Sequence, residues 1–174
     1  MTIENYGFIQ TPYKLQYPTN DVYPQLRING DNSGDLIVRV HLSDKPQDKI
    51  ELTINHGPSR VSFVDLVGNG PGKSNEHRHQ QGYGKLLVNL AIQVVRRSEW
   101  VTMETPVHGT ITDERTAVVA FWRAFGMTAS SPGAIGHGRI SGKVGDLITV
   151  QREYLAGGVF PLSLGLSHFV KCVD

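Results

Sequence analysis

The residues best suited to chemistry in this chain lie in one glycine-rich span, 63–90, which reads FVDLVGNGPGKSNEHRHQQGYGKLLVNL. This span holds two segments with the composition of a phosphate-binding loop, GNGPGKS and HQQGYGK. Both combine a lysine with glycines, whose missing Cβ lets a phosphate approach the backbone. Only one of the two segments leads into a helix, and that difference decides between them.

The second segment leads directly into an amphipathic pattern that predicts a helix over 82–97. Apolar residues fall at 86/87, 90/91 and 94/95, the spacing at which a helix buries one face. The first four N–H groups of a helix have no acceptor within it, and its dipole favours negative charge there. The amides around Gly82 and Gly84, with Lys85 adding charge, are therefore predicted to bind a diphosphate.

The first segment lacks the spacing of the phosphate loop of nucleotide hydrolases. That loop requires G-x-x-x-x-G-K-[ST] between a strand and a helix. Here Val67 stands where the first glycine is needed, and Gly82 and Gly84 occupy positions where early helical turns should run. We therefore expect 68–79 to be a loop with a solvated lysine, Lys73.

Histidines in the same loop raise the question of a metal site. His77 and His79 could chelate together in an extended segment, with Glu76 assisting. No further Cys or His cluster lies nearby in the sequence to complete a tetrahedral site, so no metal is predicted. The single cysteine, Cys172, excludes an intrachain disulfide and fits a reducing cytoplasm.

Around the glycine-rich span, the sequence predicts strands in the first third of the chain and strands that alternate with helices in the second half. Segments 25–28, 35–42, 49–56 and 60–68 alternate apolar and polar residues, which predicts an antiparallel meander. After the first helix, the pattern predicts a strand at 100–107 and a second helix at 113–125. Thr112 or Asp113 is the expected N-cap of that helix, and Gly126 its terminating residue.

The remaining segments give weaker patterns. Residues 129–144 are rich in Gly and Ser without a period, which indicates a mobile loop. Strands are expected at 146–154 and 161–173, and no element is assigned to 1–24.

Bulk composition narrows the class of protein. A chain of 174 residues, 39% of them hydrophobic, fits one domain over 1–174. The net charge of +1 gives no electrostatic reason to expect a nucleic acid or a membrane surface as partner. No apolar run approaches the ~20 residues that span a bilayer, and the N-terminus lacks the pattern of a secretory signal. A cytoplasmic protein is expected.

The order of these motifs resembles the GNAT superfamily of acyl-CoA-dependent N-acyltransferases. HQQGYG at 79–84 is similar to the family signature [Q/R]-x-x-G-x-[G/A] between a strand and a helix. AVVAFWRAFGM at 117–127 is similar to the family's later helix, and 60–127 match the family order. Residues 146–173 would supply its closing hairpin. The resemblance implies an α+β fold: a mixed, mostly antiparallel GNAT-like sheet with two main helices, 82–97 and 113–125.

The same resemblance implies the ligand and its site. Acetyl-CoA would be the cosubstrate and an amine the acceptor, with direct attack of the amine on the thioester. The CoA diphosphate would lie on the amides of Gln81, Gly82, Tyr83, Gly84 and Lys85. The pantetheine arm would pair with Leu66 and Val67 as an extra strand. Splaying of the strands that end near Val67 and Met103 would leave a slot for the thioester.

Such a reaction needs a base near the thioester. Asp65 is expected on the same partly buried strand face as Val61 and Phe63, where it could act directly or through water. Glu104, on the neighbouring predicted strand, is the second candidate, and His108 is the third.

Several positions depart from the family pattern. His79 stands where Gln or Arg is usual, and Trp122 replaces a tyrosine that many members use to protonate the departing thiolate. The first third also lacks the usual pair of helices. Two alternatives therefore stay open: a catalytically inactive GNAT-fold protein that binds CoA or a protein partner, and a β-rich interaction module with a purely structural glycine loop.

Overall fold

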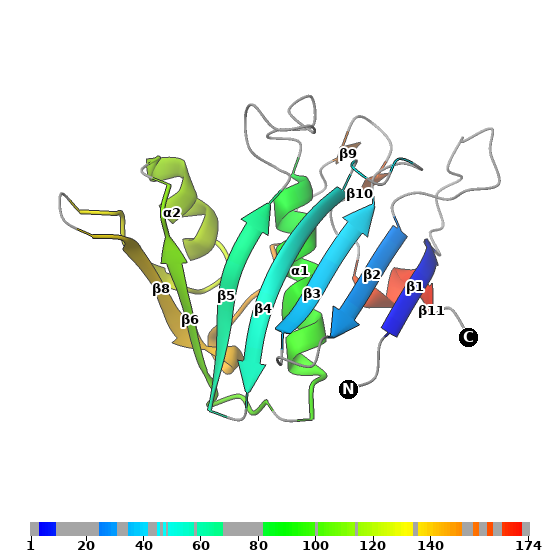
Figure 1. Cartoon of the computed structure of the whole chain (residues 1–174), viewed down its shortest axis with the longest axis horizontal. Helices are drawn as coiled ribbons and strands as arrows, with labels where there is room; N and C mark the ends of the chain where they lie inside the picture. Colours follow the sequence, from blue (N-terminus) through cyan, green and yellow to red (C-terminus); the bar gives the residue numbers. More distant parts are fainter. Residues whose placement is uncertain are drawn as a thin grey trace.

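The computed structural model shows a β-sheet with helices against it (Figure 1). It describes residues 4–9, 25–30, 35–41, 45, 47, 49–57, 59–67, 82–99, 101–113, 115–133, 136–150, 155–156, 160–161 and 165–171. The strands are β1 (Glu4–Ile9), β2 (Gln25–Gly30), β3 (Asp35–His41), β4 (Lys49–Gly57), β5 (Arg60–Val67), β6 (Pro106–Ile111), β7 (Thr128–Ala129), β8 (Gly138–Lys143), β9 (Leu155–Ala156), β10 (Phe160–Pro161) and β11 (Phe169–Lys171). The helices are α1 (Tyr83–Arg96) and α2 (Thr116–Arg123), with short 3-10 turns η2 (Val144–Asp146) and η3 (Leu166–His168).

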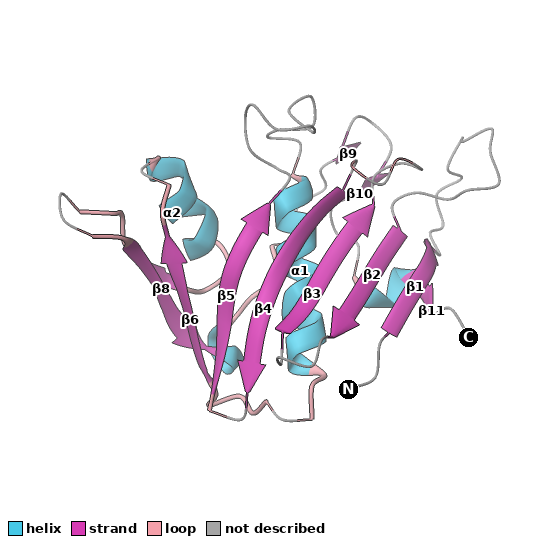
Figure 2. Ribbon diagram, viewed as in Figure 1, coloured by secondary structure: helices cyan, strands magenta, loops and turns pink. Residues whose placement is uncertain are grey.

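Nine of these strands form one sheet in the order β11-β1-β2-β3-β4-β5-β6-β8-β7, and β9 pairs with β10 separately (Figure 2). Among the described pairs of the sheet, only β5 and β6 are parallel. The predicted α+β class, with a mixed, mostly antiparallel sheet and two main helices, is therefore confirmed.

The meander of the first third is confirmed nearly to the residue. The four segments predicted as strands are β2, β3, β4 and β5, and each pairs antiparallel with the next. Their alternating apolar residues lie on one face, as the burial of Leu36, Val38 and Val40 in β3 shows. Strand β1, which pairs with β2 and β11, falls in a segment where the sequence predicts no element.

Both helices cover the same face of the sheet (Figure 1). Helix α1 packs on β3 and β4, and nearly all of its first ten residues are buried. Trp122 of α2 contacts Phe63 of β5, whose neighbour Ile54 belongs to the same buried face. No helix in the described part of the chain has the length and apolar composition needed to cross a bilayer.

Polar side chains of α1 fix a segment that the sequence predicts as a strand. The buried side chain of Asn89 donates to the Val150 carbonyl oxygen (3.0 Å) and accepts from the Val150 N–H (2.8 Å). Arg96 donates to the Leu147 carbonyl oxygen, and the Ile148 N–H donates to the Phe125 carbonyl oxygen (2.9 Å). The described part of 146–154 therefore bonds to the helix and its neighbours, and the strand prediction there is wrong.

The strand predicted at 100–107 begins later, at Pro106. Residues before it form a turn, closed by a hydrogen bond from the Thr105 N–H to the Thr102 carbonyl oxygen (3.1 Å) and by the Thr105 hydroxyl, which accepts from the Thr102 N–H (2.9 Å). The inward positions of β6 are Val107, Gly109 and Ile111, so a glycine interrupts the apolar period that would have marked this strand.

The expected mobile loop at 129–144 is also wrong, because β8 lies within it. Strand β8 pairs with β6 on one side and β7 on the other. Its inward positions are Gly138, Ile140 and Gly142, so only one of three carries an apolar signal. The antiparallel pair that directly follows α2 is therefore β7 with β8, ahead of the segment 146–173 that was expected to form the closing hairpin.

Helix α2 starts later than predicted. Its N-cap is Arg115, and its first turn holds no acidic residue. Asp113 precedes the helix and accepts a hydrogen bond from the Arg115 N–H (2.9 Å), which closes a short turn. At the other end, α2 stops at Arg123 with Ala124 as its C-cap, before the predicted end at 125. Gly126 lies two residues past the cap, and its φ of 82° is the left-handed backbone that its predicted role requires.

Substitution of Gly126 by alanine is expected to lower the free energy of unfolding by about 2 kcal/mol or more. The positive φ strains any residue with a Cβ, and a Cβ at this position would lie 2.2 Å from the Asp146 carbonyl oxygen. Urea denaturation measures the change. Gly133→Ala is the matched control, because a Cβ there meets nothing within 4 Å. Equal stability of the two variants would contradict the expectation.

Candidate functional site

A slot opens where the two parallel strands stop pairing. Pairing of β5 with β6 ends at Phe63 and Gly109, although β5 runs on to Val67 and β6 to Ile111. At that last pair a Cβ on Gly109 would lie 2.9 Å from the Phe63 carbonyl oxygen, so glycine allows the backbones to meet before they diverge. Beyond it lies a cavity of about 890 Å³.

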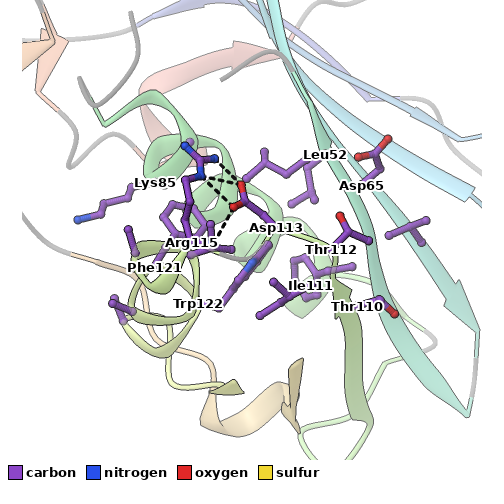
Figure 3. A pocket seen from close by; sticks show the side chains of 18 of the residues that line it. Leu52, Asp65, Lys85, Thr110, Ile111, Thr112, Asp113, Arg115, Phe121 and Trp122 are labelled. Carbon is purple, nitrogen blue, oxygen red and sulfur yellow. Dashed lines mark hydrogen bonds and ion pairs between the residues drawn. The ribbon is translucent and has the colours of Figure 1, made fainter. Parts of the chain in front are cut away.

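The cavity has four walls: the ends of β5 and β6 with the neighbouring Leu52, the start of α1, helix α2, and the segment before α2 (Figure 3). Its volume is within the range of small-molecule sites. The lining residues with charged side chains are Asp65, Lys85, Asp113 and Arg115.

A β-bulge decides where Asp65 lies. Asp65 is opposite Thr53 and Phe63 is opposite Ile54, which leaves Val64 with no opposite residue on β4. The extra residue shifts the alternation, so Asp65 shares a face with Thr53 and not with the buried Val61 and Phe63. The expected partly buried position is wrong: Asp65 is exposed, at the rim of the cavity.

Leu66 does lie at the predicted position on the slot. It is opposite Leu52 on the helix-covered face of the sheet, and both side chains line the cavity. Val67 is the last residue of β5. Because β5 has no β6 partner after Phe63, the edge of 64–67 that faces away from β4 borders the slot.

The start of α1 forms the second wall. Gly82, the N-cap, has a φ of 90°, which glycine adopts without strain. The first hydrogen bond of the helix runs from the Leu86 N–H to the Gly82 carbonyl oxygen (3.0 Å). The N–H groups of residues 83–85 therefore come before the first bond of the helical ladder. Gly82, Gly84 and Lys85 all line the cavity.

The predicted diphosphate contacts also include the amides of Tyr83 and Gln81. The Tyr83 side chain is 4% exposed and belongs to the hydrophobic core, so only its backbone is placed for the predicted role. Gln81 lies outside the described residues, as do the loop histidines and Lys73.

Aromatic residues of α2 form the third wall. Trp122 makes an edge contact with Phe63 (ring centroids 5.8 Å apart) and another with Phe121 (5.2 Å). It is 7% exposed and packs within the core while one part borders the cavity. Trp122 is therefore mainly a packing residue.

An ion pair stands at the fourth wall. The Arg115 guanidinium donates to both carboxylate oxygens of Asp113, with Nε 2.9 Å from each (Figure 3). These bonds from the Arg115 side chain, and then that from its N–H, lower the pKa of Asp113 to about 2. Asp113 is therefore ionised at neutral pH. The side chains of Arg115 and Asp113 remain 50% and 35% exposed.

The other two candidate bases do not belong to this cavity. Glu104 lies in the turn before β6, and its exposed carboxylate pairs with Lys143 (2.6 Å). The slot opens at the carboxyl ends of the parallel strands, whereas Glu104 lies beyond the amino end of β6. The expectation that Glu104 lies on the strand beside Asp65 is therefore wrong. His108 is exposed within the paired part of β6 and does not line the cavity.

Sequence reasoning missed the contribution of the segment after β6. Thr110, Thr112, Asp113 and Arg115 line the cavity, whereas the sequence pattern predicts only a loop end and the first turn of a helix here. The pair Asp113 and Arg115, two residues apart before an apolar run, was the available signal. The sequence alone does not reveal that this segment faces the slot, because that depends on β6 ending at Ile111.

No protein-family model matches the chain, and no curated protein matches it.

Proposed function

We propose that this protein is an acyl-CoA-dependent N-acyltransferase that transfers an acetyl group from acetyl-CoA to an amine. The observation that carries the proposal is the slot between β5 and β6, which opens beside the glycine-led start of α1. The order β5, α1, β6, α2 and then an antiparallel pair supports it, because the GNAT resemblance implies that order. The pair is β7 and β8 in place of the expected later hairpin.

The residues at the slot fit CoA in charge and shape. Gly82 and Gly84 present backbone with no Cβ at the positive end of a 14-residue helix, which suits a diphosphate. Lys85 adds a cation in the first turn. The bordering edge of β5 at 64–67 suits the amide groups of pantetheine, which would extend the sheet. Bound acetyl-CoA supplies the reactive thioester.

In the proposed reaction, the protein positions the acceptor and removes its proton. The amine nitrogen attacks the thioester carbonyl carbon, the amide C–N bond forms and the C–S bond breaks. Asp65, on the rim of the slot, accepts the proton of the amine directly or through one water. The CoA thiolate leaves and takes up a proton, so charge balances over the cycle.

The chemistry of Trp122 bears on whether the protein is an enzyme or only a CoA-binding protein. An indole N–H is not an acid at physiological pH, so Trp122 does not protonate the thiolate. Trp122 packs in the core at the position where the resemblance implies an acid. This favours a second candidate function, a protein of the same fold that binds CoA without transferring the acyl group. In the acyltransferase the thiolate proton would come from solvent or from Asp65 after it has accepted the amine proton.

Acetyl-CoA at 100 times its Kd is expected to stabilise the protein by ~2.7 kcal/mol, or roughly 5–10 °C in the unfolding midpoint. Thermal unfolding with and without the ligand measures this. Mg-ATP serves as control, because the other glycine segment lacks the spacing of a nucleotide loop. A shift with ATP and none with any acyl-CoA would contradict the proposal. Release of free thiol with candidate amines then distinguishes the enzyme from the non-catalytic binder.

A further inference from the structure

We propose that Arg115 binds a phosphate group of the acyl-CoA, and that Asp113 competes with that phosphate for the guanidinium. This inference rests on the proposed function. It adds a ligand-binding residue from the segment before α2 and a competing carboxylate that sets the affinity.

Arg115 lies on the cationic side of the cavity. Among the described residues, Arg115 and Lys85 are the two cationic ones that line the cavity, and they lie together on the side where α1 begins (Figure 3). Asp65 stands on the opposite side, at the rim formed by β5. Asp113 offsets one of the two cations, so this side keeps one net positive charge and the Asp65 rim one negative charge. The cavity is therefore polarised, with its positive side at the glycine-led helix start where the diphosphate is proposed to bind.

The Arg115 side chain is also suited to binding a phosphate. The Arg115 guanidinium is a planar fork of donors, and such a fork matches two oxygens of a phosphate as well as two oxygens of a carboxylate. It already makes a two-oxygen arrangement with Asp113, in which Nε donates to Oδ1 and the terminal Nη2 donates to Oδ2. Because half of the Arg115 side chain is exposed, this ion pair contributes little stability and can be exchanged.

The backbone of this segment can stay in place during such an exchange. The Arg115 N–H is held by Asp113 Oδ1 (2.9 Å), and the Arg115 carbonyl oxygen accepts from the Val118 N–H (3.0 Å) at the start of α2. The guanidinium can therefore turn to a phosphate while the turn before α2 remains closed. An asparagine at 113 would keep an oxygen acceptor for that N–H and would lose the negative charge.

The test uses the two members of the pair, whose substitutions are expected to act in opposite directions. By calorimetry, Arg115→Gln should weaken CoA binding about tenfold, the loss of one charge-assisted contact. Asp113→Asn should tighten CoA binding about two- to fivefold, because it removes the competitor. Pantetheine, which lacks both the diphosphate and the 3′-phosphate, should bind equally to all three proteins. Arg115→Lys, which keeps the charge without the fork, should fall between Gln and wild type.

One more ligand identifies which phosphate Arg115 contacts. If Arg115 contacts the 3′-phosphate, the loss caused by Arg115→Gln should disappear with 3′-dephospho-CoA. If it contacts the diphosphate, the loss should remain.

Unfolding midpoints of the variants establish that they are folded. Wild-type affinity of Arg115→Gln for CoA, or weaker binding by Asp113→Asn, would overturn the inference alone. Failure of wild type to bind CoA or acetyl-CoA would overturn the proposed function, and this inference with it.

Discussion

Replacing Gly82 by aspartate is expected to weaken CoA binding by more than about 100-fold without unfolding the protein. Gly82 stands at the N-cap of α1 with a φ of 90° and lines the cavity. A carboxylate at this position would face the diphosphate at short range and would occupy the positive end of the helix dipole. Calorimetric titration with CoA measures the loss, and thermal unfolding without ligand checks the fold.

Gly82→Asn is the matched control for this experiment. Asparagine and aspartate have the same shape, and both tolerate the left-handed backbone better than other residues with a Cβ. The asparagine variant should lose up to about tenfold in affinity, from the added Cβ in the cradle, so the difference between the variants reports the charge alone. If aspartate and asparagine weaken CoA binding equally, the diphosphate does not lie at the start of α1.

Asp65→Asn is expected to lower the rate of acyl transfer by ~10²–10⁴-fold at saturating acetyl-CoA. The amide cannot accept the proton of the attacking amine, while it keeps the size of the carboxylate. Asp65 is exposed at the rim of the slot, away from the cationic end of the cavity, so binding of acetyl-CoA should be nearly unchanged. Thiol release with an accepted amine measures the rate.

Glu104→Gln provides the comparison. Glu104 was the second predicted base, but its carboxylate lies beyond the amino end of β6 and pairs with Lys143 on the surface. The glutamine variant should therefore keep the wild-type rate. A large loss in Glu104→Gln together with an active Asp65→Asn would mean that the acceptor is activated outside the slot.

Local patterns in the sequence predict the elements that alternate strongly. Strands β2 to β5 and helix α1 have clear apolar periods, so burial on one face sets both their type and their extent. Strand β8 escapes such a prediction because Gly138 and Gly142 occupy two of its three inward positions. A glycine on an inward face leaves no hydrophobic signal, although it faces the core as its neighbours do.

The sequence predicts those parts of the candidate site that depend on a single segment. It does not predict the parts that depend on how strands pair with one another. The glycines at the start of α1 are identified from the helix that they open, and they line the cavity. The facing of Asp65 depends on an unpaired residue, Val64, which only the register against β4 reveals. The role of the segment before α2 likewise depends on where β6 ends.

The bulge at Val64 also makes this position of β5 tolerant of more than one kind of genetic change. Many substitutions at this exposed residue would leave the register as it is, since its side chain has no opposite neighbour. Loss of the Val64 codon would also leave Asp65 opposite Thr53 and Leu66 opposite Leu52, because regular alternation after Phe63 places them there without a bulge. Missense changes and the in-frame loss of this one codon should therefore both persist at Val64, since neither moves the carboxylate to the other side of the sheet.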